Sequence, residues 1–154
     1  MVTIRDGVVP DDVERCAEVW VAAIERRDGS VDHETMARRV RESFASPLVR
    51  FAVATAPRFG FATVEQGTVD AAEAYLHYLA VDPRGIGSGV GCELLADAIA
   101  HATAAGFTTL ALDVKEDNVR AISLYERAGF KAAGTPVRHA TAAYRMQSYI
   151  LRLA

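Results

Sequence analysis

Leu79-Ala-Val-Asp-Pro-Arg-Gly-Ile-Gly-Ser-Gly-Val-Gly-Cys-Glu-Leu-Leu95 is the stretch of this chain that decides its fold. An apolar run comes first, then glycines at every second position from Gly85 to Gly91, then an apolar pattern of helical period. Glycines at alternate positions permit positive φ and remove Cβ atoms, so backbone N–H groups can approach a ligand closely. The N-terminus of a helix behind them adds further N–H groups suited to a phosphate. A bare tight turn would need fewer glycines, so we predict a strand, an anion-binding loop and a helix.

Two well-known phosphate-binding patterns fit this stretch poorly. The P-loop requires Lys and then Ser or Thr after its last glycine, whereas Gly91 is followed by Cys92-Glu93. The dinucleotide pattern G-x-G-x-x-G fails because the fifth residue after Gly85 is Val90. One feature still favours a dinucleotide, since Asp113 ends the next predicted strand, where an acid can bind a ribose hydroxyl. A dinucleotide-binding domain therefore remains an alternative.

Hydrophobic patterns on both sides of this stretch predict a mixed α/β chain. Runs rich in β-forming residues predict strands at 2–5, 50–55, 58–65, 74–81, 107–114, 131–133 and 143–153. Predicted helices open at Pro10, at Asp32, at the end of the glycine loop and at Asn118. Strands 50–55 and 58–65 read as a hairpin, and the unit from 74 to 114 reads as a right-handed parallel crossover. Alternation along 74–81 predicts that Tyr75, His77, Leu79 and Val81 share one face.

Bulk properties favour one globular domain over residues 1–154 and exclude several classes of protein. The chain has 154 residues and a formal charge of −3, which argues against a nucleic-acid partner. It has no uninterrupted apolar run of about 18 residues, so we expect no membrane span. No signal peptide is recognisable at the N-terminus, which favours the cytoplasm. Cys16 and Cys92 form neither a disulfide framework nor a metal motif, and we expect no metal.

The stretch 79–95 also resembles the acyl-CoA-binding motif of the GNAT N-acetyltransferase superfamily. In that motif, an apolar residue, Ala and Val end a strand, and Pro and a Gln/Arg-x-x-Gly-x-Gly/Ala loop lead into a helix. A second family signature, N-x-x-A-x-x-L-Y-x-x-x-G-F, is matched by Asn118, Ala121, Leu124-Tyr125-Glu126 and Gly129-Phe130. The resemblance covers nearly the whole chain. It implies a mixed, mostly antiparallel sheet with a central splayed parallel strand pair, flanked by about four helices.

The family motif can be placed on the glycine loop in two registers. Counting without gaps from Val81 puts Ile86 at the motif's first position and makes Gly89 and Gly91 its glycines. Counting from Arg84 gives a literal R-x-x-G-x-G, but the apolar pair 94–95 then comes two residues too late. We prefer the ungapped register. The resemblance then implies that acetyl-CoA is held by Leu79, Ala80, Val81, Ile86, Gly87, Ser88, Gly89, Val90, Gly91, Cys92 and Asn118.

The resemblance also implies a chemistry, in which an amine attacks the thioester of acetyl-CoA directly. Tyr125 matches the position that serves as general acid for the departing thiolate in many members; the plainer alternative is a core tyrosine with a satisfied hydroxyl. The base is less defined, because Tyr75 stands where some members carry a glutamate. His77 is the candidate base, with an intrinsic pKa near 6.5. Glu73 and a water relay remain alternatives.

The leading hypothesis is an acetyl-CoA-dependent N-acetyltransferase that acts on a primary amine of a small molecule or protein. A non-catalytic acyl-CoA-binding module on the same fold is the second. Lys115, Arg120 and Arg127 are candidates for the CoA 3′-phosphate, although surface exposure explains them equally well. An acyl-cysteine route through Cys92 is less favoured than simple packing. The apolar run 149–153 could pair across a homodimer.

Overall fold

The computed structural model describes residues 1–138 and 144–154 and shows an α/β fold. The predicted strand 143–153 therefore begins, at Ala143, outside the described residues. The elements along the chain are β1 (Thr3–Asp6), α1 (Val13–Asp28), α2 (His33–Ser43), β2 (Arg50–Ala56), β3 (Gly60–Gln66), β4 (Glu73–Val81), the 3-10 turn η1 (Pro83–Gly85), α3 (Val90–Ala104), β5 (Thr109–Lys115), α4 (Val119–Arg127), β6 (Lys131–Arg138) and β7 (Arg145–Arg152).

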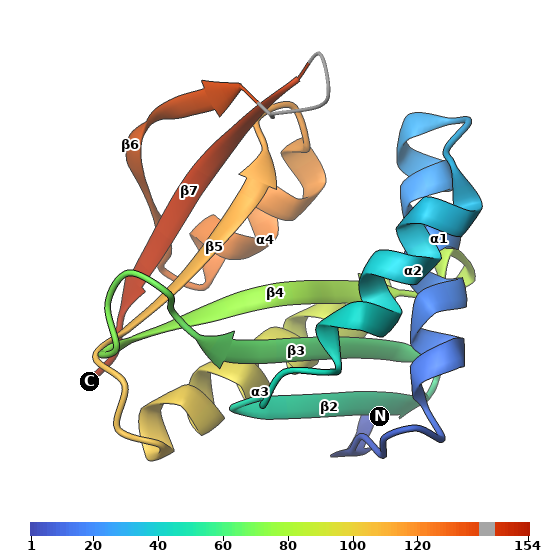
Figure 1. Ribbon diagram of the computed structural model, residues 1–154, viewed down its shortest axis with the longest axis horizontal. Helices are drawn as coiled ribbons and strands as arrows, with labels where there is room; N and C mark the ends of the chain where they lie inside the picture. Colours follow the sequence, from blue (N-terminus) through green and yellow to red (C-terminus); the bar gives the residue numbers. More distant parts are fainter. Residues whose placement is uncertain (139–143) are drawn as a thin grey trace.

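The strands form one sheet in the order β1-β2-β3-β4-β5-β7-β6, and β4 and β5 are its parallel pair (Figure 1). These two strands pair only over their first residues, with Glu73 opposite Thr109 and Tyr75 opposite Ala111. Beyond that point β4 keeps its antiparallel partner β3, while β5 pairs with β7. The two halves of the sheet therefore diverge in Figure 1, and the expected mixed sheet with a splayed parallel pair is confirmed.

Helices cover both faces of the sheet, and each side has its own core. Helix α3 packs on one face through Val90, Leu94 and Ala98, which are fully buried together with the inward side chains of β2, β3 and β5. Helices α1 and α2 cover the other face of β2–β4, where Cys16 and Val40 join the core (Figure 1). The i, i+4 spacing of these apolar residues explains why each helix buries one stripe.

Several helix ends follow from capping residues, as the sequence predicts. The side chain of Asp32 accepts a hydrogen bond from Thr35 N at 3.2 Å at the start of α2. Asn118 does the same for Ala121 N at 3.3 Å at the start of α4. Gly106, just beyond α3, has φ +91°, the left-handed conformation that a helix C-terminus favours in glycine. The predicted boundaries of these helices are therefore confirmed to within a few residues.

Strand β4 contains a β-bulge at His77. Thr63 of β3 pairs with Tyr78, and the next residue, Val64, pairs with Leu76, so His77 is an extra residue with no opposite partner. Side chains alternate along a strand, and one extra residue therefore reverses the face on which all the following side chains lie.

The bulge corrects the prediction that Tyr75, His77, Leu79 and Val81 share one face. Leu79 and Val81 pack against the core on the α3 side. The ring of His77 instead stacks on Tyr78, with 4.3 Å between centroids, and Tyr78 belongs to the core beneath α1 and α2. The pairing with β3 sets this reversal, and simple alternation in the sequence does not reveal it.

The C-terminal part differs from prediction in two respects. Strand β6 continues to Arg138, with an irregularity between Ala133 and Val137, whereas the sequence predicted only 131–133. Strand β7 lies between β5 and β6, so Tyr149 and Ile150 are paired on both sides. The prediction that the run 149–153 pairs across a homodimer is therefore wrong for Tyr149 and Ile150. A homodimer formed through another face stays a prediction. Among residues 1–138 and 144–154, no helix has both the length and the apolar character needed to cross a membrane.

Candidate active site

A cavity of about 340 Å³ opens where β4 and β5 separate. Its walls come from α1, α2, the middle of β4, the end of β5, the start of α4 and β7. They include Trp20, Arg39, His77, Asp113, Asn118 and Tyr125. The sequence-predicted residues His77, Leu79, Asn118 and Tyr125 therefore meet around one space, although they come from two separate parts of the chain, β4 and the capped helix α4.

The side chain of Tyr125 lines this cavity. Its side chain is 8% exposed and packs against Phe130, with 5.8 Å between ring centroids. Burial raises the pKa of Tyr125 to about 12, and the positive charge of Arg27 opposes that shift without cancelling it. Within the described part of the chain the hydroxyl has no hydrogen-bond partner. A core tyrosine with a satisfied hydroxyl is thus not what the structure contains, and Tyr125 keeps its proton at neutral pH.

The glycine loop follows β4 and turns through η1 into α3. Gly87 and Gly89 have φ of +83° and +85°, which L side chains rarely adopt, and a Cβ at either position would meet no neighbouring atom within 4 Å. The need for glycine here is therefore conformational. The side chain of Asp82 caps η1 by accepting from Arg84 N at 3.0 Å, and the Arg84 guanidinium beside it lowers the pKa of Asp82 to about 2.

The amides of the glycine loop fall into two groups, those with a backbone acceptor and those without one in the described part of the chain. Ser88 N donates to Gly85 O at 3.0 Å, and Ile86 N lies 3.4 Å from Pro83 O. In residues 1–138 and 144–154, no backbone acceptor is recorded for the amides of Gly87, Gly89, Val90, Gly91 and Cys92. The hydroxyl of Ser88 is also buried and unpaired among these residues. Unpaired N–H groups at a helix N-terminus can bind an anion such as a phosphate.

The end of β4 leaves backbone groups open on the side of β5. Asp82 N donates to Phe59 O at 2.8 Å, which fixes the alternation of hydrogen-bonded pairs between β3 and β4. Ala80 then bonds with β3, while the N–H and C=O groups of Leu79 and Val81 point toward the gap left by β5. Two of the three predicted strand residues are therefore available to a ligand through their backbone, and Ala80 is not.

His77 lies at the bulge with a carboxylate beside it. Its Nδ1 is 3.3 Å from Glu65 Oε2, a contact that favours a proton on Nδ1 and leaves Nε2 as the acceptor. The imidazole is partly exposed to the cavity. The alternative base, Glu73, lies at the far end of β4, where its carboxylate is 3.4 Å from the hydroxyl of Thr109.

Asp113 forms a hydrogen-bonded group that the sequence did not reveal. Its Oδ2 accepts from the Tyr75 hydroxyl at 2.8 Å, and its Oδ1 accepts from the Ser148 hydroxyl at 2.5 Å. Burial raises the pKa of Tyr75, and the neighbouring Asp113 charge acts in the same direction. Because Asp113 already binds two hydroxyls, it is less suited to a ribose hydroxyl, which weakens the dinucleotide hypothesis.

The remaining predicted residues lie at the margin of the site. Cys92 is exposed in the first turn of α3, and Arg120 and Arg127 are exposed on α4. Lys115 lines the cavity, but its Nζ lies 3.4 Å from Asp28 Oδ1. No set of three or more His, Cys, Asp or Glu side chains in the described ranges is arranged to hold a metal ion.

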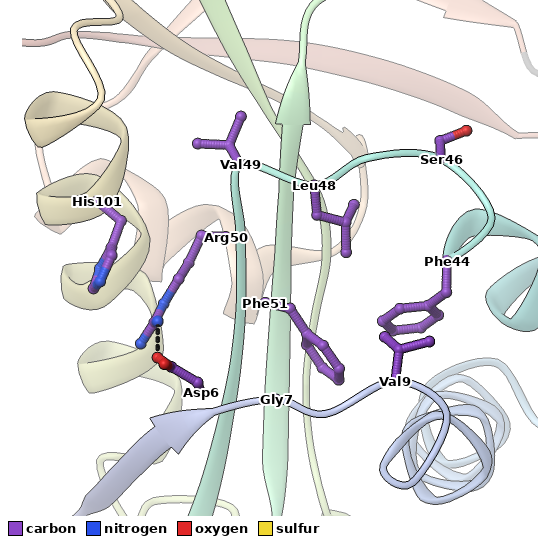
Figure 2. Close-up of a pocket in the computed structure, with 10 residues that line it drawn as sticks. All are labelled: Asp6, Gly7, Val9, Phe44, Ser46, Leu48, Val49, Arg50, Phe51 and His101. Atoms are coloured by element: carbon purple, nitrogen blue, oxygen red, sulfur yellow. Dashed lines mark hydrogen bonds and ion pairs between the residues drawn. The ribbon is translucent and has the colours of Figure 1, made fainter.

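A second hollow of about 390 Å³ lies at the β1–β2 edge of the sheet (Figure 2). Arg50 crosses it to pair with Asp6, and on its other side it makes two hydrogen bonds to Asp97 at 2.8 and 2.9 Å. Phe44 and Phe51 form its apolar wall. None of the predicted site residues lines this hollow, and its one arginine is fully paired with acids of the protein itself.

The chain is similar in sequence to known acetyltransferases. The model of the acetyltransferase (GNAT) family matches residues 18–130. A mycothiol acetyltransferase of Clavibacter michiganensis is 31% identical over 133 residues, which cover 80% of this chain and 42% of that protein. The chain spans less than half the length of the curated relatives it matches.

Solved structures share the whole fold. The ribosomal-protein-S18-alanine N-acetyltransferase from Escherichia coli is 26% identical with a TM-score of 0.71, covering 99% of this chain and 93% of that one. The PaiA N-acetyltransferase from Thermoplasma acidophilum, solved in complex with coenzyme A, is 21% identical with a TM-score of 0.72, covering 96% and 98%. The family match and the splayed-strand fold lead to one conclusion: this chain belongs to the acetyltransferase (GNAT) family.

Proposed function

We propose that the protein is an acetyl-CoA-dependent N-acetyltransferase that moves an acetyl group directly from CoA to a primary amine. The observation that carries this proposal is the unpaired hydroxyl of Tyr125, facing a cavity that opens between β4 and β5. A donor of this kind, held protonated by burial, suits the protonation of a departing thiolate.

The groups along β4 and α3 fit acetyl-CoA as a substrate. The free amides of Gly87 and of 89–92 would hold its diphosphate, since they lie at the start of a helix and have no backbone acceptor in the described chain. The outward backbone groups of Leu79 and Val81 would hydrogen-bond the pantetheine arm as a neighbouring strand does. Asn118, at the cavity wall, already serves as the cap of α4.

The reaction needs two protons removed from the ammonium group, one before and one after the N–C bond forms, and one proton delivered to the thiolate. A free alkylamine has a pKa near 10.4, so only about one molecule in a thousand is neutral at pH 7. His77 is proposed to take the ammonium proton at Nε2, because Glu65 holds its other nitrogen. The neutral amine then forms the N–C bond, the C–S bond breaks, and the thiolate takes the proton of Tyr125. The nitrogen loses its second proton as the amide forms, and that proton restores the phenol of Tyr125. No acyl-enzyme is required, and Cys92 has no part in the transfer.

Relatives suggest an acetylated small molecule, but they leave the acceptor of this chain open. Several curated relatives carry the name mycothiol acetyltransferase, and the chain covers between 21% and 42% of their length. The cavity that receives the acceptor is built by α1, α2 and β7, outside the cofactor motifs. The amine therefore has to be identified by assay.

An amine panel with acetyl-CoA, read by thiol release, tests the proposal. We expect release with at least one class of primary amine, and a higher melting temperature with acetyl-CoA but not with NAD. A melting temperature that rises with NAD but not with acetyl-CoA would contradict the proposal.

One observation favours a second candidate, a non-catalytic acyl-CoA-binding module. Tyr75 stands where some family members carry a glutamate base, and its hydroxyl is committed to Asp113. That candidate predicts stabilisation by acetyl-CoA and no thiol release above background with any amine. The same two measurements therefore separate the two functions.

A further inference from the structure

We infer that the acceptor amine also carries a carboxylate or similar anionic group, which Arg39 and Tyr78 bind on the α1–α2 side of the cavity. This inference rests on the proposed N-acetyltransferase function and specifies its substrate class. The bulge in β4 creates this binding position. It turns the side chain of Tyr78 toward the same side of the sheet as Tyr75 and His77, and away from Leu79.

Arg39 stands out among the charged groups of the cavity wall. The wall carries three cationic side chains, Arg27, Arg39 and Lys115, and one acidic side chain, Asp113. Arg27 pairs with Asp28 at 2.8 Å, and Lys115 lies 3.4 Å from the same carboxylate.

Arg39, by contrast, has no acidic partner within residues 1–138 and 144–154. A guanidinium that faces a cavity without a carboxylate of its own has its fork of donors available to a ligand.

The hydroxyl of Tyr78 gives Arg39 a second donor at the same place. Tyr78 is 7% exposed and lines the cavity, and its hydroxyl has no hydrogen-bond partner in the described part of the chain. Arg39 lines the same cavity, and its positive charge opposes the rise in the pKa of Tyr78 that burial causes. The nearest acid, Glu65, is held by His77 at 3.3 Å. A planar guanidinium beside a phenol is a pair that fits the two oxygens of a carboxylate.

Apolar side chains surround this pair. Trp20 meets the Tyr78 ring edge-on at 4.8 Å, and Met36 lines the wall beside Arg39 on α2. Arg39 is exposed and Tyr78 is buried, so only the Tyr78 side of the pair is shielded from water. The acceptor that matches this wall has an amine directed toward His77, a carboxylate next to that amine at Arg39, and an apolar side chain, as in an apolar amino acid.

Matched pairs of amines test this assignment. Leucine with isoamylamine, and phenylalanine with phenethylamine, differ only in a carboxylate. With acetyl-CoA and wild-type protein, we expect the carboxylate-bearing member of each pair to have a kcat/KM at least about tenfold higher.

Arg39→Gln should remove that preference, with a roughly tenfold to hundredfold loss for the amino acid and less than about twofold change for the plain amine. Tyr78→Phe should lower the preference in the same sense while leaving the ring that packs on Trp20.

Arg38→Gln is the matched control. Arg38 neighbours Arg39 on α2, lies outside the cavity, and pairs on the surface with Glu42 at 3.6 Å. It should behave as wild type. A readout without turnover is the fluorescence of Trp20, the one tryptophan of the sequence, during titration with N-acetyl-leucine in the presence of CoA. Arg39→Gln should weaken that titration by a similar factor.

The outcomes separate this inference from the proposed function. Equal turnover of both members of each pair, or an equal loss for both in Arg39→Gln, overturns the inference and leaves the N-acetyltransferase intact. If neither kind of amine gives thiol release, although acetyl-CoA stabilises the protein, the proposed function is overturned and the inference with it.

Discussion

The hydroxyl of Tyr75 donates a 2.8 Å hydrogen bond to Asp113 Oδ2 across the point at which β4 and β5 part. Tyr75 belongs to the last residue pair of the two strands, opposite Ala111, and Asp113 lies two residues further along β5. Ser148 of β7 binds the other oxygen of the same carboxylate. A side-chain network thus joins the two halves of the sheet where their backbone pairing ends.

Tyr75→Phe should weaken this junction. The substitution removes one hydrogen bond to a carboxylate and keeps the ring, so we expect unfolding free energy to fall by about 1–2 kcal/mol. Urea unfolding measures the change. Ser148→Ala removes the other hydrogen bond to Asp113 and should cost a similar amount. Unchanged stability in both variants would show that the network does not hold the strands together.

Tyr125→Phe should lower turnover and leave acetyl-CoA binding intact. Loss of a general acid reduces kcat by roughly a hundredfold or more, because the thiolate then departs unprotonated. Calorimetry of acetyl-CoA binding is the control, since the ring still packs against Phe130. Full turnover in the variant would make Tyr125 a structural residue.

The two thiols should differ in reactivity. Burial raises the pKa of Cys16 to about 12, whereas Cys92 is exposed at the start of α3. An aromatic disulfide reagent should modify one thiol in the native protein and two after denaturation, and acetyl-CoA should slow the native reaction.

Cys92→Ala should abolish the native reaction and keep turnover within about twofold. A loss of more than about a hundredfold in turnover would instead favour an acyl-cysteine route.

Asp82 should make stability depend on pH at the acidic end only. Its carboxyl pKa is lowered to about 2 in the folded protein by Arg84, from an ordinary value of 3.8. A carboxyl with a depressed folded pKa adds stability above its unfolded pKa, and loses that contribution as pH falls toward the folded value.

The melting temperature of wild type should therefore exceed that of Asp82→Asn above about pH 5, with the gap closing between about pH 4 and 2. Asp11→Asn, on the exposed start of the chain, is the control. A gap that stays constant down to pH 2 would refute the assigned pairing.

Local chemistry explains why much of the architecture could be predicted from the sequence. The glycine pattern after an apolar strand is sufficient to predict the loop and α3, and Asp32 and Asn118 cap their helices as expected. Tyr125 and Asn118 could be assigned to one site because two motifs stand at a fixed separation.

Long-range pairing explains what the sequence did not reveal. The bulge at His77 exists because of the register with β3, and no local pattern in β4 marks it. Tyr75 and Asp113 are 38 residues apart in sequence, and nothing in the local pattern of either strand indicates that they bind each other. Arg39 reads as part of a solvated helix face until α2 is packed beside Tyr78.

The amides at the start of α3 provide the most direct test of the proposed acetyl-CoA site. Labelled with nitrogen-15 and titrated with acetyl-CoA, the protein should show its largest amide shifts at Gly87, at 89–92, and at Leu79 and Val81, with none of this pattern on addition of NAD. Shifts confined to other regions, or absent at saturating acetyl-CoA, would contradict the site and the transferase function built on it.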